Sequence, residues 1–194
     1  MKKILLIPLS IIAIIITLFM VFFMFWTEKY KTTNISDYSK YLGQDGEHNN
    51  SIFPYNIPSS AKIQDFCYYY YNPFDPNYVS YLVYSCDDVD YAKETERLSK
   101  LESSKDYLIY GATGFKYPVC AVYADSYNGY IYALADKENN RLIYVEINFC
   151  NYLSDIDYEE IIDKQYLPID FNAKSGNPTQ QAYQESLTLQ ESTS

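Results

Sequence analysis

The feature that most constrains this chain is an uncharged, strongly apolar run at its N-terminus. Residues 4–26 carry no charge, and sixteen of these 23 residues are Ile, Leu, Val or Phe. At about 1.5 Å per residue such a helix is roughly 35 Å long, enough to cross a hydrocarbon core of about 30 Å. The run therefore predicts a single transmembrane helix within an N-terminal anchor, residues 1–26.

A cleaved signal peptide is the alternative interpretation of this run. Its apolar region would span about 7–15 residues and end at a cleavage site of small residues. The run here is longer, and the sequence FMFWTEKYK that ends it has no such site. The sequence favours an uncleaved anchor in plasma membrane lipid, and whether the segment is ever cleaved stays open. Because only three residues precede the run, we expect a cytoplasmic N-terminus and a C-terminal domain outside.

The charge of the chain excludes one class of function. The net charge is −10 and the sequence pI is about 4.5. Binding to nucleic acid phosphates needs clustered Lys and Arg. An acidic chain without such a cluster is not expected to bind nucleic acid.

Composition divides the rest of the chain into three parts. Residues 27–50 are polar and predict a stalk. Residues 51–171 are long enough to bury one core and predict a single extracytoplasmic domain. Residues 172–194 have little aliphatic content, which predicts a disordered tail.

Within the domain, strand patterns dominate. Runs rich in Tyr, Val, Ile and Phe, separated by turn residues, predict strands at 62–71, 78–86, 106–110, 116–124, 129–135 and 141–149. One helix is predicted at 87–103, where carboxylates suit the positive N-terminal end, and a short helical turn at 157–163. The expected fold class is α+β, a mainly antiparallel sheet with one covering helix, preceded by the transmembrane helix.

The segment 129–149 is predicted to be a hairpin whose turn is either KENN, residues 137–140, or its inner pair Asn139-Asn140. Either turn places Tyr130, Tyr132 and Leu134 on the same face as Ile143, Val145, Ile147 and Phe149. We expect that face to be core, with Tyr144, Glu146 and Asn148 pointing the other way.

The stretch DFCYYYYNPFDPNYVSYLVYSC, residues 65–86, reads as a second hairpin whose loop is 72–77, because proline cannot donate to a sheet ladder. We expect the two strands to pair with Cys67 opposite Cys86, which predicts a disulfide. The same pairing puts Tyr68, Tyr70 and Tyr81 together on the opposite face.

Two interpretations of these tyrosines remain open. They are good strand formers that the helix at 87–103 would cover. Alternatively, Tyr68, Tyr70 and Tyr81 form an exposed aromatic platform for an unknown protein or glycan partner, since tyrosine offers a large contact area and a hydroxyl group. They are the candidate ligand-binding residues.

Other chemistry has little support in the sequence. The one histidine, His48, lies in the predicted stalk, which disfavours histidine-based metal sites and nucleophilic triads. No C-x-x-C or phosphate-loop motif is present, and the pairing of Cys120 and Cys150 is open. We therefore expect a non-enzymatic binding or interaction module without metal or cofactor. A cell-envelope hydrolase that uses a pair of carboxylates is the alternative.

Three stretches carry a resemblance to known sequences: SIFPYNIPSSAKIQDFCYYYYNPFDPNY, VYSCDDVDYAKETERLSKL, and GYIYALADKENNRLIYVEINF followed by QYLP. Together they resemble an uncharacterised family of small membrane-anchored or secreted proteins of gut-dwelling Firmicutes. The resemblance covers most of residues 51–168. It implies a bacterial envelope location and a single domain, and it supplies no catalytic motif.

Overall fold

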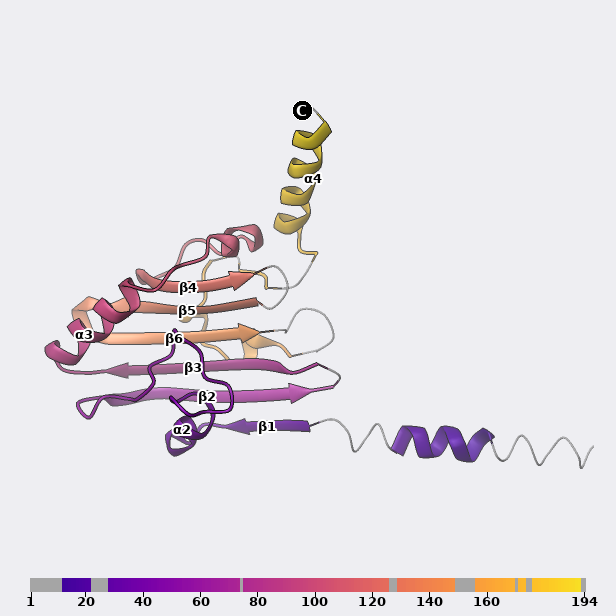
Figure 1. Cartoon of the computed structure of the whole chain (residues 1–194), viewed down its shortest axis with the longest axis horizontal. Coiled ribbons are helices and arrows are strands. Elements are labelled where there is room, and N and C mark those ends of the chain that lie inside the picture. Colours follow the sequence, from indigo (N-terminus) through magenta and orange to yellow (C-terminus); the bar gives the residue numbers. More distant parts are fainter. Residues whose placement is uncertain are drawn as a thin grey trace, which may run out of the picture.

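The centre of the molecule is one antiparallel sheet with the strand order β1-β2-β3-β6-β5-β4 (Figure 1). The computed structural model describes residues 12–21, 28–73, 75–125, 129–148, 156–169, 171–173 and 176–192. The strands are β1 (Glu28–Thr32), β2 (Lys62–Asn72), β3 (Asn77–Ser85), β4 (Val119–Asp125), β5 (Gly129–Asp136) and β6 (Arg141–Asn148). The α-helices are α2 (Tyr38–Tyr41), α3 (Asp88–Ser99) and α4 (Pro178–Ser192), with a further helix at 12–21. Short 3-10 helices are η1 (Ile35–Asp37), η2 (Asp106–Tyr110), η3 (Lys137–Asn139), η4 (Tyr158–Glu160) and η5 (Lys164–Tyr166).

This architecture confirms the predicted α+β class with a mainly antiparallel sheet. The strands predicted at 62–71, 78–86, 116–124, 129–135 and 141–149 are all present. The strand predicted at 106–110 was wrong, because that segment is the 3-10 helix η2. Gly111 ends η2 with a φ of 70°, a left-handed conformation that suits glycine, and the turn buries Tyr110.

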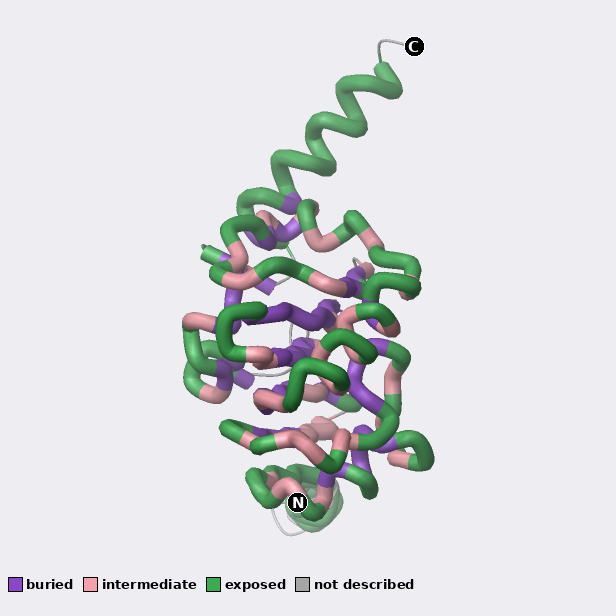
Figure 2. The backbone as a smooth tube through the Cα atoms, turned by 90° about the vertical axis from the view of Figure 1, so that its left-hand side faces the viewer, coloured by how far each residue is buried: buried purple, intermediate pink, exposed green. Residues whose placement is uncertain are grey.

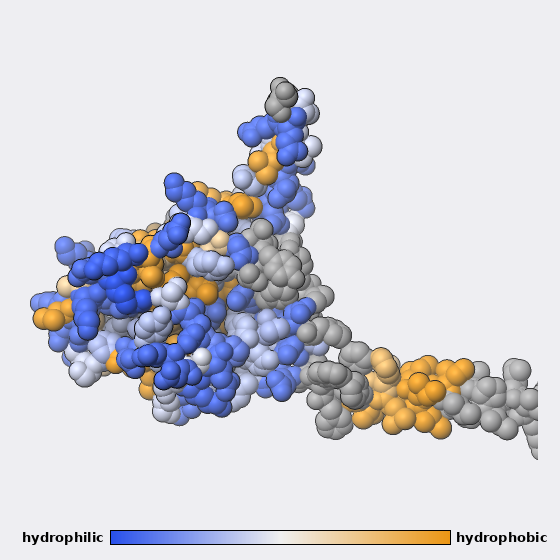
Figure 3. All heavy atoms as spheres, in the orientation of Figure 1, coloured by the Kyte–Doolittle hydropathy of each residue, from blue (hydrophilic) through white to orange (hydrophobic). Residues whose placement is uncertain are grey.

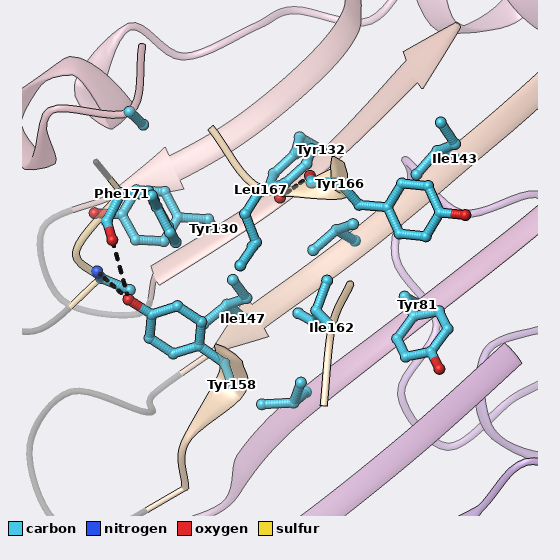
Figure 4. Close-up of a cluster of buried hydrophobic side chains, with 14 of the residues drawn as sticks. Tyr81, Tyr130, Tyr132, Ile143, Ile147, Tyr158, Ile162, Tyr166, Leu167 and Phe171 are labelled. Atoms are coloured by element: carbon cyan, nitrogen blue, oxygen red, sulfur yellow. Dashed lines mark hydrogen bonds between the residues drawn. The ribbon is translucent and has the colours of Figure 1, made fainter. Parts of the chain in front are cut away.

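The first core lies on the sheet face that carries Tyr130, Tyr132 and Leu134. These residues pair with Ile147, Val145 and Ile143 across the hairpin and share their face, as the sequence predicted, whereas Phe149, expected on the same face, lies outside the described residues. The segment from η4 to Phe171 covers this face (Figure 4). Tyr132 donates a hydrogen bond to the carbonyl of Tyr166 at 2.8 Å, which joins the cover to the sheet.

The second core lies on the opposite face of the same sheet, where the sequence predicted a covering helix at 87–103 but no cover from the segment before β2. Tyr144 points away from the first core, as expected, but its side chain is fully buried. It packs with Tyr68, Leu82, Tyr84 and other residues of this face under α3 and the N-terminal segment. Figure 2 shows the consequence: the strands are buried between two exposed layers.

Residues 28–61 form much of the cover of the second core, which corrects the stalk predicted at 27–50. β1 pairs antiparallel with β2, from Glu28 opposite Asn72 to Thr32 opposite Tyr68. Leu42 and Phe53 are fully buried in the second core. The few apolar side chains of residues 28–61 thus pack on the sheet, and these residues belong to the folded domain.

Helix α3 forms the rest of this cover, as predicted. Asp87 caps its N-terminus by accepting a hydrogen bond from the Asp90 amide at 2.9 Å. Leu98 of α3 is fully buried in the second core. The Arg97 guanidinium donates to the carbonyls of Ser51 (2.6 Å) and Ile52 (2.7 Å), and so ties α3 to the N-terminal segment.

The Asp87→Ala substitution should lower the free energy of unfolding by about 1 kcal/mol, because it removes the acceptor for an amide of the first helical turn. Urea denaturation of both proteins measures the difference. Lys93→Ala, at an exposed position of the same helix, is the matched control and should change stability by less than about 0.5 kcal/mol. Equal effects of both substitutions would contradict the capping role.

The C-terminal segment predicted as disordered contains α4. At its start the Gln180 amide nitrogen Nε2 donates to the Tyr110 hydroxyl at 3.0 Å, and Gln180 is buried. Beyond this contact α4 is exposed and stands away from the sheet (Figures 1 and 2). The prediction of disorder is therefore wrong for residues 178–192, which are helical.

The predicted transmembrane helix is described only in part. Residues 12–21 form a helix of exposed apolar side chains (Figure 3), whereas residues 4–11 and 22–26 lie outside the described residues. Within the described ranges, no helix combines the length and the apolarity that a membrane crossing requires.

Candidate functional site

The register of β2 and β3 decides where the candidate tyrosines lie. Cys67 pairs with Tyr81, and Tyr68 pairs with Ser80. The predicted loop was two residues too long, because β2 continues to Asn72 and β3 already begins at Asn77, and the predicted partner of Cys67, Cys86, lies five residues beyond its observed partner. Since side chains alternate along a strand, this difference in register reverses the face of one strand relative to the other.

The predicted platform of Tyr68, Tyr70 and Tyr81 is therefore wrong in its composition. Tyr68 and Tyr70 lie on the face of the second core, whereas Tyr81 belongs to the first core on the other side of the sheet. Tyr68 and Tyr81 are buried, with 1% and 8% of their surfaces exposed, and Tyr70 is half-buried. Only Tyr68 and Tyr70 remain together in one candidate site.

The predicted disulfide between Cys67 and Cys86 is also wrong. Both residues are free cysteines, as is Cys120, and Cys150 lies outside the described residues. Cys67 is part of the first core and Cys86 packs against the second, so the sheet separates them. Burial raises the pKa of Cys67 to about 11, which keeps this thiol protonated and unreactive at neutral pH.

The candidate site is a pocket of about 430 Å³ between the β1–β2 edge of the sheet and the segment that follows β1. It is lined by Glu28, Lys29, Tyr30, Tyr41, Glu47, His48, Tyr68 and Tyr70. The rings of Tyr41 and Tyr68 are stacked, with centroids 4.3 Å apart and planes 8° from parallel. The Tyr30 ring lies 5.2 Å from that of Tyr41 and 6.5 Å from that of Tyr68.

His48 belongs to this pocket, although the sequence placed it in a stalk. Its ring centroid lies 4.4 Å from that of Tyr78, 5.8 Å from that of Tyr70 and 5.9 Å from that of Tyr68. The His48 amide donates to the Tyr41 carbonyl at 2.8 Å, which folds this segment back on itself. Burial lowers the pKa of His48, so its imidazole is neutral at neutral pH.

The turn that positions His48 needs a glycine. A Cβ atom at Gly46 would lie 2.5 Å from the Tyr41 carbonyl carbon and oxygen. Gly46 therefore lets the chain pass close to α2, and the sequence YLGQDGEH contains the local signal for that turn. It contains no signal for the contact between His48 and the distant tyrosines of β2 and β3.

The pocket opens where two facing rings diverge. Tyr30 on β1 and Tyr70 on β2 are direct partners in the sheet. The Tyr30 ring contacts Tyr41 and Tyr68, whereas the Tyr70 ring lies 5.4 Å from Tyr78 and close to His48. The two partners thus contact different neighbours, and both line the pocket.

A buried carboxyl group lies in the row of side chains beside the pocket. Tyr68, Ser80 and Glu146 are register partners across β2, β3 and β6. Within the described part of the chain, neither Glu146 Oε2 nor Ser80 Oγ has a hydrogen-bond partner. Burial raises the pKa of Glu146 to about 7, and the nearby Ser80 hydroxyl opposes the rise.

The side chains of the site are suited to binding a ligand. Among the described residues, no group of three His, Cys, Asp or Glu side chains is arranged to hold a metal ion. The pocket instead offers aromatic rings, tyrosine hydroxyl groups, a neutral imidazole and two carboxylates. Such a surface can hold a small ligand by stacking, hydrogen bonds and charge.

Comparison with known proteins adds no further constraint. No protein-family model matches the chain, and searches of curated proteins and of solved structures found no match.

Proposed function

We propose that this protein is a single-pass membrane protein that displays its α+β domain outside the plasma membrane as a binding module. The apolar run 4–26, with its exposed apolar helix at 12–21, supports the membrane attachment. Lys2 and Lys3, which stand directly before the apolar run, support a cytoplasmic location of that side of the run. The resemblance to membrane-anchored or secreted proteins of gut Firmicutes agrees with an envelope location.

The observation that carries the binding role is the pocket lined by Tyr30, Tyr41, Tyr68, Tyr70 and His48. Its volume of about 430 Å³ lies in the range of small-molecule sites, about 300–1,000 Å³. Its aromatic lining comes from three separate segments of the chain, which the fold brings to one edge of the sheet.

A hydrolase with a carboxylate pair is the second candidate, since Glu28 and Glu47 both line the pocket. Both residues are exposed. The acid catalyst of such enzymes is commonly held in an apolar site that keeps it protonated. Glu146 has such surroundings, but it is a buried core residue outside the lining. Because the carboxylates of the pocket are exposed and the carboxyl group with a raised pKa lies outside the pocket, the structure favours binding over hydrolysis.

Membrane attachment and topology predict a specific fractionation result. In cells that express the full chain, the protein should stay in the membrane pellet after an alkaline wash. A C-terminal epitope tag should be cleaved by protease added to whole, wall-stripped cells. The control is the Ile14→Arg/Ile15→Arg double variant, which should leave the pellet, because each arginine near a helix centre costs about 2.5–3.5 kcal/mol on insertion.

Two results would contradict the proposal. If the wild-type protein is recovered in soluble form without its N-terminal segment, the apolar run is a cleaved signal peptide. Protection of the C-terminal tag from protease in intact cells would reverse the topology.

A further inference from the structure

We propose that the pocket binds a small organic ammonium ion, a molecule whose positively charged nitrogen carries apolar substituents. The inference rests on the proposed binding function of this same pocket and names the chemical class of its ligand. The aromatic rings, the carboxylates and the positions of two nearby lysines support it.

The rings provide the first argument. Aromatic rings carry partial negative charge on their faces and attract cations placed within about 6 Å of the ring centroid. Tyr30 has 39% of its surface exposed, and its sheet partner Tyr70 is half-buried. Because the two rings diverge, a group that enters between them would have tyrosine on two sides.

The carboxylates provide the second argument. Glu28 and Glu47 line the pocket, and neither side chain forms an ion pair or a hydrogen bond within the described part of the chain. Two negative charges beside electron-rich rings make the pocket complementary to a cation. The net charge of −10 adds a field of the same sign.

The lysines provide the third argument. Lys29 places its ammonium on the opposite face of the sheet, 5.5 Å from the centroid of Tyr69 and 6.0 Å from that of Tyr71, so this charge does not occupy the pocket. Lys40 places its ammonium 4.7 Å from the centroid of Tyr41 and donates to the Tyr41 hydroxyl at 3.0 Å. A ring of the pocket lining therefore already holds an ammonium group of the protein itself.

A sugar ring is the competing occupant, and the geometry favours it less. Sugar rings stack on the open face of an aromatic ring. Here the stacked pair of Tyr41 and Tyr68 occupies one face of each ring, and Lys40 lies over Tyr41. Tyr68 is also buried. The open space lies between divergent rings and beside carboxylates, which suits a compact cation better than a flat, neutral ring.

The direct test compares choline with its uncharged isostere, 3,3-dimethylbutan-1-ol. Both ligands are titrated by calorimetry into the full chain, purified in a non-ionic detergent so that no detergent head group competes. Choline should bind, and the isostere should bind at least about 10-fold more weakly, because only the charge differs. Added salt should weaken choline binding, since the carboxylates are exposed. Equal affinities for both ligands, or no choline binding, would overturn the proposal.

Substitutions then locate the site. Tyr30→Leu should weaken choline binding by about 2- to 30-fold, whereas Tyr30→Phe keeps the ring and should bind as the wild type does. Glu47→Gln should weaken binding by up to about 5-fold, with Glu102→Gln, a remote exposed glutamate, as the unaffected control. Equal effects of the two Glu→Gln variants would place any choline site elsewhere and would count against the proposal.

Lys40→Gln gives a result that only a cationic ligand produces. Removal of this neighbouring positive charge should strengthen choline binding by a few-fold, because like charges repel. A thermal melt of each variant verifies that it is folded. Weaker choline binding by Lys40→Gln would overturn the proposed charge complementarity.

The failure of this inference differs from failure of the proposed function. If N-acetylglucosamine oligomers bind in a manner that Tyr30→Leu abolishes while choline does not bind, the ammonium ligand is wrong and the binding module stands. Membrane attachment and topology are decided separately by fractionation.

Discussion

Tyr144→Ala should lower the free energy of unfolding by about 3–5 kcal/mol, the range for removal of a large buried aromatic side chain. Tyr144 is fully buried, and its ring lies 5.5 Å from that of Phe53 and 5.9 Å from that of Tyr84. Its hydroxyl donates to Glu94 Oε1 at 2.8 Å and lies 3.2 Å from the Tyr84 hydroxyl. Truncation leaves a cavity where α3, the sheet and the N-terminal segment meet.

Two control variants separate the effect of the buried ring from that of its hydroxyl group and from that of removing any tyrosine. Tyr144→Phe keeps the packing and should cost about 1–2 kcal/mol, because it removes the hydroxyl interactions with Glu94 and Tyr84. Tyr123→Ala removes a side chain that is 52% exposed on β4 and should change stability by less than about 0.5 kcal/mol. Urea denaturation of the three variants measures the series. If Tyr144→Ala costs no more than Tyr123→Ala, the second face of the sheet is not a core.

The two hairpins show what the sequence could determine. The β5–β6 hairpin was predicted with its correct faces, because its turn has a local signature: Asn140 adopts a φ of 45°, which asparagine tolerates. In the β2–β3 hairpin, Pro73 and Pro76 mark a loop but do not fix how many residues it contains. The predicted partner of Cys67, Cys86, differs from its observed partner Tyr81 by five residues, and any odd difference reverses the face of one strand, which explains why Tyr81 and Cys67 were misplaced.

The N-terminal part of the cover of the second core was missed for a different reason. Alternation along β6 predicted that Tyr144 and Glu146 point away from the first core, but it cannot say whether another layer covers them. Much of that layer comes from residues 28–61, and the polar composition of residues 28–50 gave no sign of packing. Its buried side chains, such as Leu42 and Phe53, are too sparse to form a periodic pattern. The pocket, including His48, is built where this layer meets the sheet, so it was not predictable either.

The stability of the protein should also depend on Glu146 in a pH range that extends above the pKa of exposed glutamates. Burial raises the pKa of this carboxyl to about 7, from an ordinary value of 4.5. Between these two values the folded protein binds a proton that the unfolded chain has released. The free energy of unfolding therefore falls as the pH rises through this interval, by about 3 kcal/mol in total at about 1.4 kcal/mol per pH unit.

Glu146→Gln should remove this dependence, because glutamine keeps the shape of the protonated carboxyl and cannot ionise. Relative to the wild type, the variant should gain about 2–3 kcal/mol of stability between pH 5 and pH 8, measured by urea denaturation at both values. Comparing the two values cancels any constant cost of the amide. It also cancels the contribution of His48, which has the opposite sign and is present in both proteins. Glu102→Gln, at an exposed position, should leave the pH dependence unchanged. The same pH dependence in wild type and Glu146→Gln would show that this carboxyl is ionised in the folded protein at pH 5 already, with water or a counter-charge beside it.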